Sequence, residues 1–462
     1  MKINKLIDTK YKVKVKKIKT NSKDIEKGDI FVCTLGLIDK RKYIDDAIKK
    51  CCSFVLVNEE INYNIPHKVV DDINDTLWHM LNRYYDYPLK KVNLVGVTGT
   101  DGKTTITTIL KDMTDGTCIG TNGFILKNKV IDLGNTTPSL DKVYDCLHKS
   151  IQKKKHNVFM EVSSESYLTK RIPHLFFDIA VFTNITKEHL DKHQTFNNYL
   201  DCKMELLKNS GLVILNRDCK YFHKLKKVNN NYLTYGFRKS DLTIKKYRLY
   251  FDHTYIMFNY QNKDYHIVSP LIGKYNIYNL MASFLVMLGL NYDIEDIIKR
   301  VSLIKTIKGR NEIVYQKDFT VMIDHAHTIN ATRSILKFVK RVKKGRLITI
   351  LGCAGNRYKE KRSIIGKIAL KYSDIVIFTM DDPYDEEPNK IIDEMLKRNR
   401  FSFKKYYRIV DRKKALEKAI ELAKSKDFVL VLGRGRDKVM HLKNKDIIHN
   451  DYIELKKILS IR

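Results

Sequence analysis

Residues 92–105 read Val92-Asn93-Leu94-Val95-Gly96-Val97-Thr98-Gly99-Thr100-Asp101-Gly102-Lys103-Thr104-Thr105, an apolar run that leads through a glycine-rich turn into a helix-like segment. The two glycines of the turn allow its N–H groups to point inward, the geometry that holds phosphate oxygens at a helix N-terminus. Lys103 would reach the outer phosphates, and Thr104 would bind Mg²⁺. The spacing is Gly-Thr-x-Gly-Lys-Thr, shorter than the usual phosphate loop, and it indicates a narrower group of ATP-binding proteins. A turn without a ligand is the alternative, but the order strand, loop, helix favours phosphate binding.

Length and composition limit the class of protein. The chain has 462 residues, which predicts about three domains. No apolar run is long enough to span a bilayer, and the first residues lack the apolar core of a signal peptide. The eight cysteines are scattered without metal-binding spacing, which is typical of reduced thiols. We therefore expect a cytoplasmic protein with no membrane partner.

The net charge of +33 raises the possibility of nucleic-acid binding. The lysines, however, are spread along the whole chain, and no helix-turn-helix, zinc finger or aromatic RNA-binding platform is visible. We therefore expect no nucleic-acid partner. The charge would instead attract a polyanionic small substrate.

The order of apolar runs and turns predicts an α/β protein. Buried strands are expected at 30–33 and 53–57, before a boundary near Pro88. From Val92 the pattern is strand, turn, helix, which predicts a doubly wound parallel sheet with helices on both faces, and 235–270 alternates as antiparallel strands do. A third, Rossmann-like αβ unit begins at Gly309. The predicted domains are 1–88, 89–306 and 307–462.

Three side chains downstream of the loop could carry chemistry. Glu161 ends an apolar strand, where a carboxylate near a phosphate loop can bind Mg²⁺. His189 could bind a metal or donate a hydrogen bond, and Lys203 lies in a helix-like segment. Taken singly, these residues could equally be a solvated strand end, a packed histidine and a surface lysine.

A series of ordered motifs decides between these interpretations. Together they resemble the Mur ligases, which extend the peptide stem of the cell-wall precursor with ATP, and most of all the members that add the third residue to UDP-N-acetylmuramoyl-L-alanyl-D-glutamate. The resemblance covers nearly the whole chain. Besides the loop, the motifs are Asn135-Thr136-Thr137-Pro138, Glu161-Val162-Ser163-Ser164 with Arg171, Thr183-Asn184 with His189-Leu190-Asp191, Lys203, Gly273 with Asn276 and Asn279, Gly309-Arg310 with Glu312, and Asp324-His325-Ala326-His327-Thr328.

The resemblance implies ATP and Mg²⁺ as cofactors and an acyl-phosphate intermediate, which the amine of an incoming amino acid attacks. It implies a small N-terminal UDP-binding domain, a central phosphate-loop ATPase domain and a C-terminal amino-acid-binding domain in a protein that acts as a monomer. Lys103, Glu161, His189 and Lys203 would be catalytic. ATP would be bound by Gly99, Thr100, Asp101, Gly102, Lys103, Thr104, Thr105, Asn279, Arg310 and Asp324. The metal ligands would be Thr104, Glu161, His189 and Lys203 as a carbamate, an oxygen ligand that suits Mg²⁺. The UDP-linked muramoyl peptide would be bound by Ser22, Thr136, Thr137, Ser163 and Arg171.

The C-terminal part departs from the family where the amino acid is chosen. The resemblance places Arg357, Asp381, Asp382, Tyr384, Gly433 and Asp437 around that substrate. Members that add meso-diaminopimelate carry Asp-Asn-Pro-Arg, whose Arg binds the distal carboxylate, whereas this chain has Asp381-Asp382-Pro383-Tyr384. An acidic pocket without that Arg predicts L-lysine or a similar diamino acid. Alternatively, Tyr384 faces solvent and Arg434 or Arg436 binds the carboxylate. Glu165 is a second departure, since the family has His there.

Three other functions remain open from the sequence. A related amide ligase could add glutamate to a polyglutamate-type substrate, although the N-terminal segment and Asn135-Thr136-Thr137-Pro138 argue against it. A catalytically silent nucleotide-binding homologue would explain the departures, but Lys103, Thr104 and Glu161 are retained. A nucleic-acid-dependent ATPase is disfavoured because no acidic pair that would activate water ends a strand.

Overall fold

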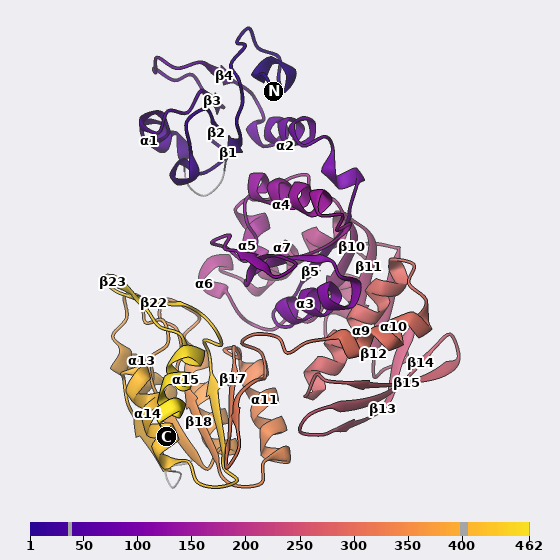
Figure 1. Cartoon of the computed structure of the whole chain (residues 1–462), viewed down its shortest axis with the longest axis vertical. Coiled ribbons are helices and arrows are strands. Elements are labelled where there is room, and N and C mark those ends of the chain that lie inside the picture. The colour runs from indigo at the N-terminus through magenta and orange to yellow at the C-terminus, as the bar shows by residue number, and fades with distance from the viewer. Residues whose placement is uncertain (36–38, 398–404, 462) are drawn as a thin grey trace.

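Three separate β-sheets, of four, eleven and six strands, form three lobes along the longest axis of the molecule (Figure 1). The computed structural model describes residues 1–35, 39–397 and 405–461. The N-terminal lobe lies at one end, the lobe with the eleven-stranded sheet lies in the middle, and the C-terminal lobe lies at the other end. This architecture confirms the predicted three-part α/β fold. We propose that the domains are bounded in the segments between the sheets, near residues 88 and 306.

The N-terminal lobe is built on a parallel sheet in the order β1-β2-β3-β4. Its central strand β3 is buried at every position, as its apolar sequence predicts. Asp72 caps α2 by accepting hydrogen bonds from the N–H groups of Asn74 and Asp75. The elements are β1 (Ile18–Lys19), β2 (Ile30–Val32), β3 (Phe54–Val57), β4 (His67–Val69), α1 (Ile44–Lys49), α2 (Ile73–Tyr84) and the 3₁₀ turns Ile3–Lys5, Ser22–Asp24, Lys40–Tyr43 and Pro88–Lys90.

The central sheet has a parallel core, β13-β12-β11-β10-β5-β9-β6, to which antiparallel strands are added at both edges. The antiparallel strands predicted near 235–270 are β13, β14 and β15. The strands are β5 (Asn93–Thr98), β6 (Thr117–Gly120), β7 (Gly123–Leu126), β8 (Lys129–Ile131), β9 (Asn157–Glu161), β10 (Phe177–Phe182), β11 (Ser210–Asn216), β12 (Tyr232–Gly236), β13 (Leu242–Leu249), β14 (Thr254–Tyr260) and β15 (Lys263–Ser269).

Helices cover both faces of this sheet, as a doubly wound fold requires. Along β10, Ile179 and Val181 pack with α3 and α9, whereas Ala180 and Phe182 pack with α4 and α7 on the opposite face. The carboxyl ends of β5, β9 and β10 therefore meet at one edge. The helices are α3 (Lys103–Thr114), α4 (Leu140–Gln152), α5 (Ser164–Leu168), α6 (Leu190–His193), α7 (Phe196–Lys208), α8 (Phe222–Leu225), α9 (Lys274–Gly289), α10 (Ile294–Arg300) and the 3₁₀ turn Val301–Leu303.

The C-terminal sheet runs in the order β16-β17-β21-β18-β19-β20, parallel except for β16. Its strands are β16 (Glu312–Gln316), β17 (Thr320–Asp324), β18 (Leu347–Leu351), β19 (Ile375–Phe378), β20 (Lys405–Arg408) and β21 (Phe428–Leu432), followed by the hairpin β22 (Val439–Leu442) and β23 (Lys445–Ile448). Its helices are α11 (Ile329–Val342), α12 (Lys361–Tyr372), α13 (Pro388–Leu396), α14 (Arg412–Leu422) and α15 (Asp451–Ile461).

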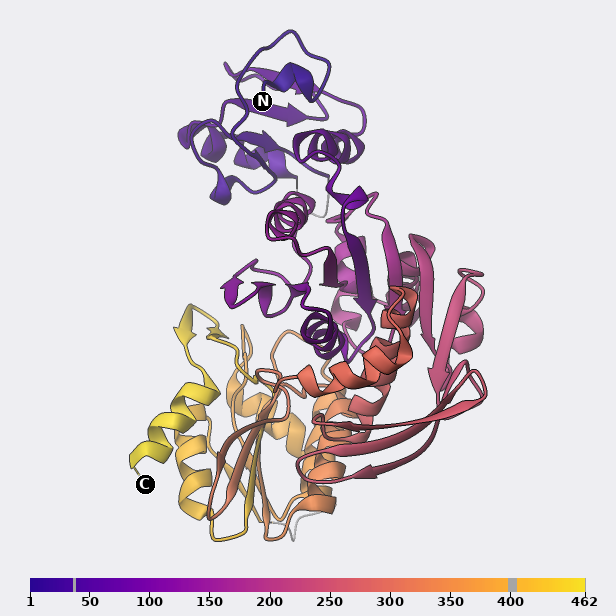
Figure 2. The same ribbon diagram turned by 45° about the vertical axis from the view of Figure 1, so that its right-hand side comes forward.

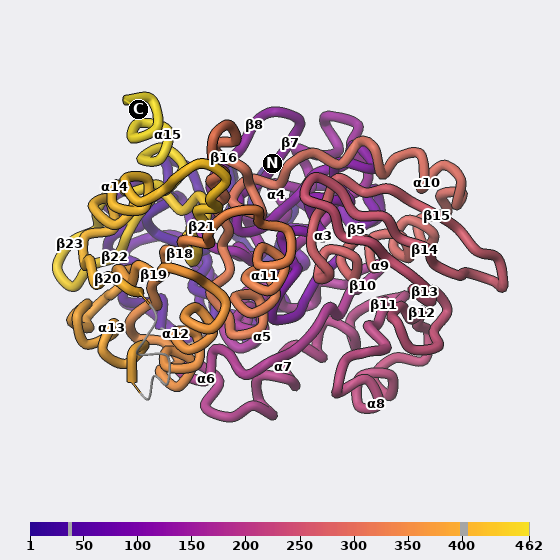
Figure 3. Tube along the Cα trace, turned by 90° about the horizontal axis from the view of Figure 1, so that it is seen from below, coloured from indigo at the N-terminus to yellow at the C-terminus, as the bar shows by residue number. Residues whose placement is uncertain are grey.

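The central and C-terminal lobes lie against each other, which Figures 2 and 3 show from two further directions. The carboxyl end of β17 and the start of α11 face the phosphate-type loop, because Thr328, which caps α11, donates to the carboxylate of Asp101 at 3.1 Å. The loops at the ends of the two parallel sheets thus share one cleft. Among the helices of the described ranges, none is long and apolar enough to cross a membrane.

Candidate active site

The loop between β5 and α3 needs its glycines. Gly99 has φ +140°, and a Cβ atom there would lie 1.9 Å from the hydroxyl oxygen of Thr183. Gly102 has φ +95°, and its Cβ would lie 2.6 Å from Oδ1 of Asn279. Both positions combine a backbone conformation that favours glycine with a lack of space. The loop therefore approaches β10 and α9 as closely as a backbone can.

A lysine, a hydroxyl and a carboxylate meet at the start of α3. The ammonium of Lys103 donates to the carbonyl oxygens of Gly99 at 2.9 Å and Thr100 at 3.1 Å. Thr104 donates to Oε2 of Glu161 at 2.9 Å, and Glu161 is 1% exposed. Burial lowers the pKa of Lys103, although Glu161 and Asp101 oppose this effect. A half-buried lysine beside a hydroxyl and a carboxylate is a donor set that fits a nucleotide phosphate together with Mg²⁺.

Lys203 and His189 lie beside the same loop. Lys203, on α7, is buried and donates to the carbonyl oxygen of Gly99 at 2.9 Å. Burial, with a contribution from Lys103, lowers the pKa of Lys203 well below its ordinary value. Burial is the main cause that lowers the pKa of His189, whose side chain is 39% exposed, and a neutral imidazole keeps a lone pair for a metal. The carboxylate of Glu165 lies 3.9 Å from Nδ1 of His189.

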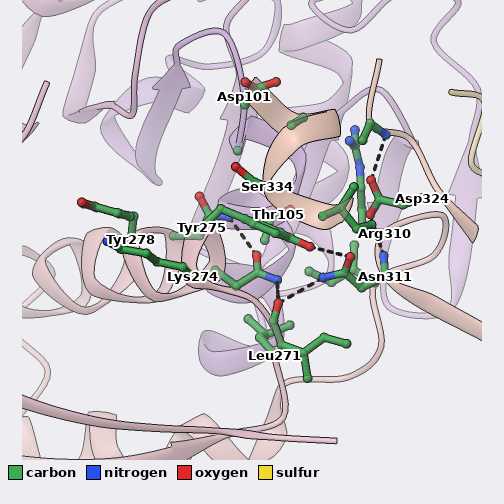
Figure 4. A pocket seen from close by; sticks show the side chains of 18 of the residues that line it. Asp101, Thr105, Leu271, Lys274, Tyr275, Tyr278, Arg310, Asn311, Asp324 and Ser334 are labelled. Carbon is green, nitrogen blue, oxygen red and sulfur yellow. Dashed lines mark hydrogen bonds between the residues drawn. The ribbon is translucent and has the colours of Figure 1, made fainter. Parts of the chain in front are cut away.

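A cavity of about 590 Å³ opens from this loop towards the C-terminal lobe and is lined by Asn279, Arg310 and Asp324 (Figure 4). Its far wall is a hydrogen-bonded chain: Tyr275 donates to Asn311 at 2.6 Å, and the Asn311 N–H donates to Asp324 at 2.7 Å. Arg310 reaches back across the cleft to within 3.4 Å of the Thr104 hydroxyl oxygen. The cavity has the size and polarity of a nucleotide site, and both lobes contribute to it.

A second cavity, of about 340 Å³, lies between the N-terminal and central lobes and is lined by Ser22, Lys40 and Arg171. Three residues predicted to bind the UDP-linked substrate, Thr137, Ser163 and Arg171, are hydrogen-bonded to one another next to this cavity. The buried hydroxyl of Thr137 donates to the carbonyl oxygen of Glu161 at 3.0 Å and accepts from the Ser163 N–H at 2.8 Å. Arg171 donates to the carbonyl oxygen of Thr137 at 3.0 Å. These bonds join the second cavity to the strand end that carries Glu161.

The sequence predicts an acidic amino-acid pocket, but an internal arginine already pairs with two of its aspartates. Arg434 is fully buried and pairs with Asp381 at 3.2 Å and with Asp382 at 2.5 Å. The two aspartates therefore do not present free negative charges beside Tyr384. The sequence identified Arg434 only as a possible ligand of a substrate carboxylate, because nothing in its spacing reveals an internal ion pair.

Tyr384 and Arg436 also have partners within the protein. The ring of Tyr384 stacks on His441 with centroids 5.4 Å apart, and its hydroxyl lies 3.4 Å from Arg357. Arg436 forms a two-pronged ion pair with Glu312. Both arginines therefore already have carboxylate partners, which argues against the alternative in which Arg434 or Arg436 binds a substrate carboxylate. Arg357 pairs only loosely with Asp191, at 3.7 Å.

Comparison with known proteins identifies the family. Residues 97–287 match the Mur ligase middle domain, and residues 309–435 match the Mur ligase glutamate ligase domain. A UDP-N-acetylmuramoyl-L-alanyl-D-glutamate–2,6-diaminopimelate ligase from Fusobacterium nucleatum is 34% identical over 96% of this chain and 95% of its own length. The chain belongs to the Mur ligase family. Mur ligases are ATP-dependent enzymes that form amide bonds in the synthesis of peptidoglycan precursors.

Other relatives agree with this assignment. A ligase of the same name from Aquifex aeolicus is 34% identical over 96% of this chain and 94% of its own length. A solved 2,6-diaminopimelate ligase structure has a TM-score of 0.68 at 22% identity and covers 100% of this chain and 99% of its own. MurF ligase from Thermotoga maritima, solved in complex with ADP, has a TM-score of 0.66 at 19% identity, with 96% coverage of both chains. These two structures share the Mur ligase fold.

The structure of this Mur ligase also contains a pair that the sequence did not reveal. Lys361, at the start of α12, donates to Glu188 of the central lobe at 2.5 Å, and both side chains are 5% exposed. Glu188 precedes His189, so the pair joins the C-terminal lobe to the predicted metal-binding segment. Lys361-Arg362 resembles a Lys-Arg pair of the family, but the sequence does not reveal that Glu188 is the partner of Lys361. Lys361 reaches Glu188 only because the central and C-terminal lobes lie close together at this point.

Asp437 is the remaining predicted amino-acid ligand. Burial in the cleft, reinforced by Asp381 and Asp382, raises its pKa to about 7 even though Arg434 opposes the shift. Its carboxylate lies 3.7 Å from Nδ1 of His325. A carboxylate that is destabilised in its charged form gains from the arrival of a cation. The Asp437 side chain is 41% exposed, so a ligand can reach it.

Proposed function

We propose that this Mur ligase uses ATP to add a diamino acid to UDP-N-acetylmuramoyl-L-alanyl-D-glutamate. One observation carries the proposal: Lys103, Thr104 and Glu161 lie together at the start of α3, and Arg310 reaches Thr104 from the other lobe, a donor set that suits phosphates and Mg²⁺. The relatives named above act on this UDP-linked dipeptide. It would bind in the cavity between the N-terminal and central lobes, which Ser22 and Arg171 line.

The residues of the cleft suit phosphoryl transfer. Lys103 and the loop N–H groups would bind the phosphates of ATP, while Asn279 and Asp324 would contact the nucleoside. Thr104 and Glu161 would hold one Mg²⁺, and His189 would face a second. The bound Mg²⁺ would neutralise phosphate charge and align the groups that react. Two observations support this arrangement: Thr104 and Glu161 are buried and hydrogen-bonded to each other, and Asn279 and Asp324 line the cavity beside them.

The reaction would have two steps. A carboxylate oxygen of the substrate attacks the γ-phosphorus of ATP, the bond to the bridging oxygen breaks, and ADP leaves. The amine nitrogen of the amino acid then attacks the carbonyl carbon of the acyl phosphate. The C–O bond breaks, inorganic phosphate leaves, and the amine proton passes to water. The chain's task in both steps is to position the substrates and to stabilise negative charge.

Lys203 fits a carbamate better than a cation. Its lowered pKa favours the neutral amine, the form that adds CO₂. The carbamate would remove a positive charge from beside Lys103 and supply oxygen atoms for Mg²⁺. We therefore propose that Lys203 is carbamylated in the active enzyme.

For the amino acid we propose L-lysine or a close analogue. Arg357 would bind the α-carboxylate that every amino acid carries, and Asp437 would accept the side-chain ammonium. Within the described residues of this pocket, Arg434 and Arg436 already have carboxylate partners, so a second substrate carboxylate would find no free guanidinium. The proposed preference for L-lysine thus depends on the charge of Asp437, because Asp381 and Asp382 pair with Arg434.

We further propose that the enzyme works as a cytoplasmic monomer without a nucleic-acid partner. All eight cysteines are free thiols, in agreement with a reducing compartment.

The direct test is a ligation assay with purified protein, ATP, Mg²⁺ and the UDP-linked dipeptide. L-lysine, L-ornithine and meso-diaminopimelate are supplied singly, and ADP and the ligated product are measured. We expect equal amounts of ADP and product, most with L-lysine. Equal use of meso-diaminopimelate would overturn the amino-acid assignment, and the absence of product with every amino acid would overturn the proposed function.

A further inference from the structure

The loop that follows β21, residues 433–437, touches the segment that enters the C-terminal lobe, residues 309–312. Gly309 has φ +72° and Gly435 has φ +57°, and a Cβ on Gly435 would lie 2.9 Å from the carbonyl oxygen of Gly309. A Cβ on Gly309 would lie 3.0 Å from the nitrogen of Arg436. The two backbones are thus in direct contact, with no side chain between them.

A two-pronged ion pair locks this contact. Nε of Arg436 donates to Oε2 of Glu312 at 2.8 Å, and Nη2 donates to Oε1. The same Oε2 accepts the N–H of Gly309 at 2.7 Å. Glu312 is 7% exposed, and the guanidinium of Arg436 lies 3.7 Å from the centre of the Tyr452 ring. Planar pairing, burial and stacking together leave Arg436 little freedom to turn towards a substrate.

Each residue of the pair lies close in the sequence to a residue that we propose to bind a substrate: Glu312 to Arg310, and Arg436 to Asp437. Arg310 follows Gly309 and reaches Thr104 of the phosphate-type loop, 3.4 Å away. Asp437 follows Arg436, lies 3.7 Å from Nδ1 of His325 and is the residue that we propose to bind the amino acid. The Gly433 N–H also donates to the carbonyl oxygen of Asp324 at 3.1 Å, so the loop is tied to a second nucleotide-facing residue. A shift of the loop would therefore move both substrate-binding segments.

We propose that the Glu312–Arg436 pair positions the amino-acid loop and the nucleotide-binding arginine as one unit, so that occupancy of the amino-acid pocket strengthens nucleotide binding. The proposal rests on the proposed function for the identity of the two ligands. Both residues are positioning residues, since each acts through its neighbours Arg310 and Asp437. Coupling of this kind is reciprocal: the nucleotide must strengthen binding of the amino acid by the same factor.

The test uses R436M, E312Q and the double variant in the full-length enzyme. We measure the KM values for ATP and L-lysine, and the Kd of a non-hydrolysable ATP analogue with and without L-lysine. We expect each single variant to raise both KM values about fivefold or more and to abolish the effect of L-lysine on the Kd. The double variant should match the single ones, because both changes remove the same pair.

The matched control is R346M. Arg346 forms a similar two-pronged pair with Asp427, but at the amino end of β18 and β21, the opposite edge of the same sheet. Its loss should lower the melting temperature without raising either KM. An increase confined to the L-lysine KM in R436M and E312Q, or an equal increase of both values in R346M, would overturn the proposal. A wild-type enzyme that binds the nucleotide but forms no amide would instead refute the proposed function.

Discussion

At the scale of single residues, Asp437 makes the amino-acid pocket sensitive to pH. Its pKa of about 7 means that it is neutral below pH 7 and charged above it, whereas the lysine side chain is a cation throughout this range. We expect the KM for L-lysine to fall about tenfold between pH 6 and pH 8. Initial rates at varied L-lysine concentration measure it. The Asp437→Asn variant should show a high KM with no such trend, and a trend that survives in this variant would assign the titration to another group.

Tyr384 determines, in our account, whether a second carboxylate can be bound. The Tyr384→Arg variant adds a guanidinium beside Arg357, at a position where φ is already +48°. We expect kcat/KM for meso-diaminopimelate to rise about tenfold relative to that for L-lysine, the scale of one bidentate pair. Competition between the two amino acids in one assay gives the ratio. An unchanged ratio would mean that Tyr384 lies outside the distal end of the pocket.

At the scale of elements, the turn between β5 and α3 tolerates no side chain at Gly99. In the Gly99→Ala variant the new Cβ would meet the Thr183 hydroxyl oxygen, so the loop must move away from β10. We expect nucleotide affinity to fall more than about tenfold, because the N–H groups would lose their alignment. Titration with a fluorescent ATP analogue checks this. Gly134→Ala is the control, since a Cβ there meets nothing within 4 Å.

Helix α15 is held to the C-terminal sheet by a buried ion pair. Asp451 accepts from Nε and Nη2 of Arg412 at 2.8 and 2.7 Å, and both side chains are inaccessible. Burial alone would raise the pKa of Asp451, but Arg412 holds it below its ordinary value. Asp451→Asn leaves a buried cation without its counter-charge, and we expect it to lower the unfolding free energy of this lobe by about 3–5 kcal/mol. Urea unfolding measures the change. Glu421→Gln on α14, where the exposed Glu421 pairs with Lys418, should change it little.

The elements were more predictable from sequence than the partners of individual charges. Apolar runs such as Phe54–Val57 and Phe428–Leu432 identify buried strands because hydrophobic periodicity is local. The Gly99 turn was predictable for the same reason. The ion pairs of Arg434 and of Lys361 were not, since their partners lie 53 and 173 residues away and depend on how loops and lobes meet. In this lysine-rich chain, the position of a charged residue in the sequence therefore says little about which residue it pairs with.

At the scale of the whole molecule, the central and C-terminal lobes are joined by apolar packing of Ile272 and Phe251 against the C-terminal core and by polar contacts around the cleft. The Glu188–Lys361 pair is the most buried of these, and Thr328–Asp101 adds a hydrogen bond to the loop itself. Domains joined in this way separate and close during catalysis in many enzymes. We therefore expect the distance between these two lobes to depend on such contacts.

Glu188→Gln tests this point. It leaves the Lys361 ammonium buried without a counter-charge, so we expect the lobes to open, the radius of gyration to increase and kcat to fall about tenfold or more. Small-angle X-ray scattering without ligands measures the opening. Glu205→Gln, which breaks only a surface pair with Lys208, should leave both quantities unchanged. Opening in both variants, or in neither, would contradict the role of the pair.

The account depends on where the nucleotide binds. A crystal structure of the enzyme with Mg²⁺ and a non-hydrolysable ATP analogue tests this most directly. We predict that the phosphates lie against Lys103 and Thr104, with the nucleoside in the cavity between Asn279 and Asp324 and with Arg310 in contact from the C-terminal lobe. Nucleotide density elsewhere, with the turn around Lys103 empty, would contradict the account.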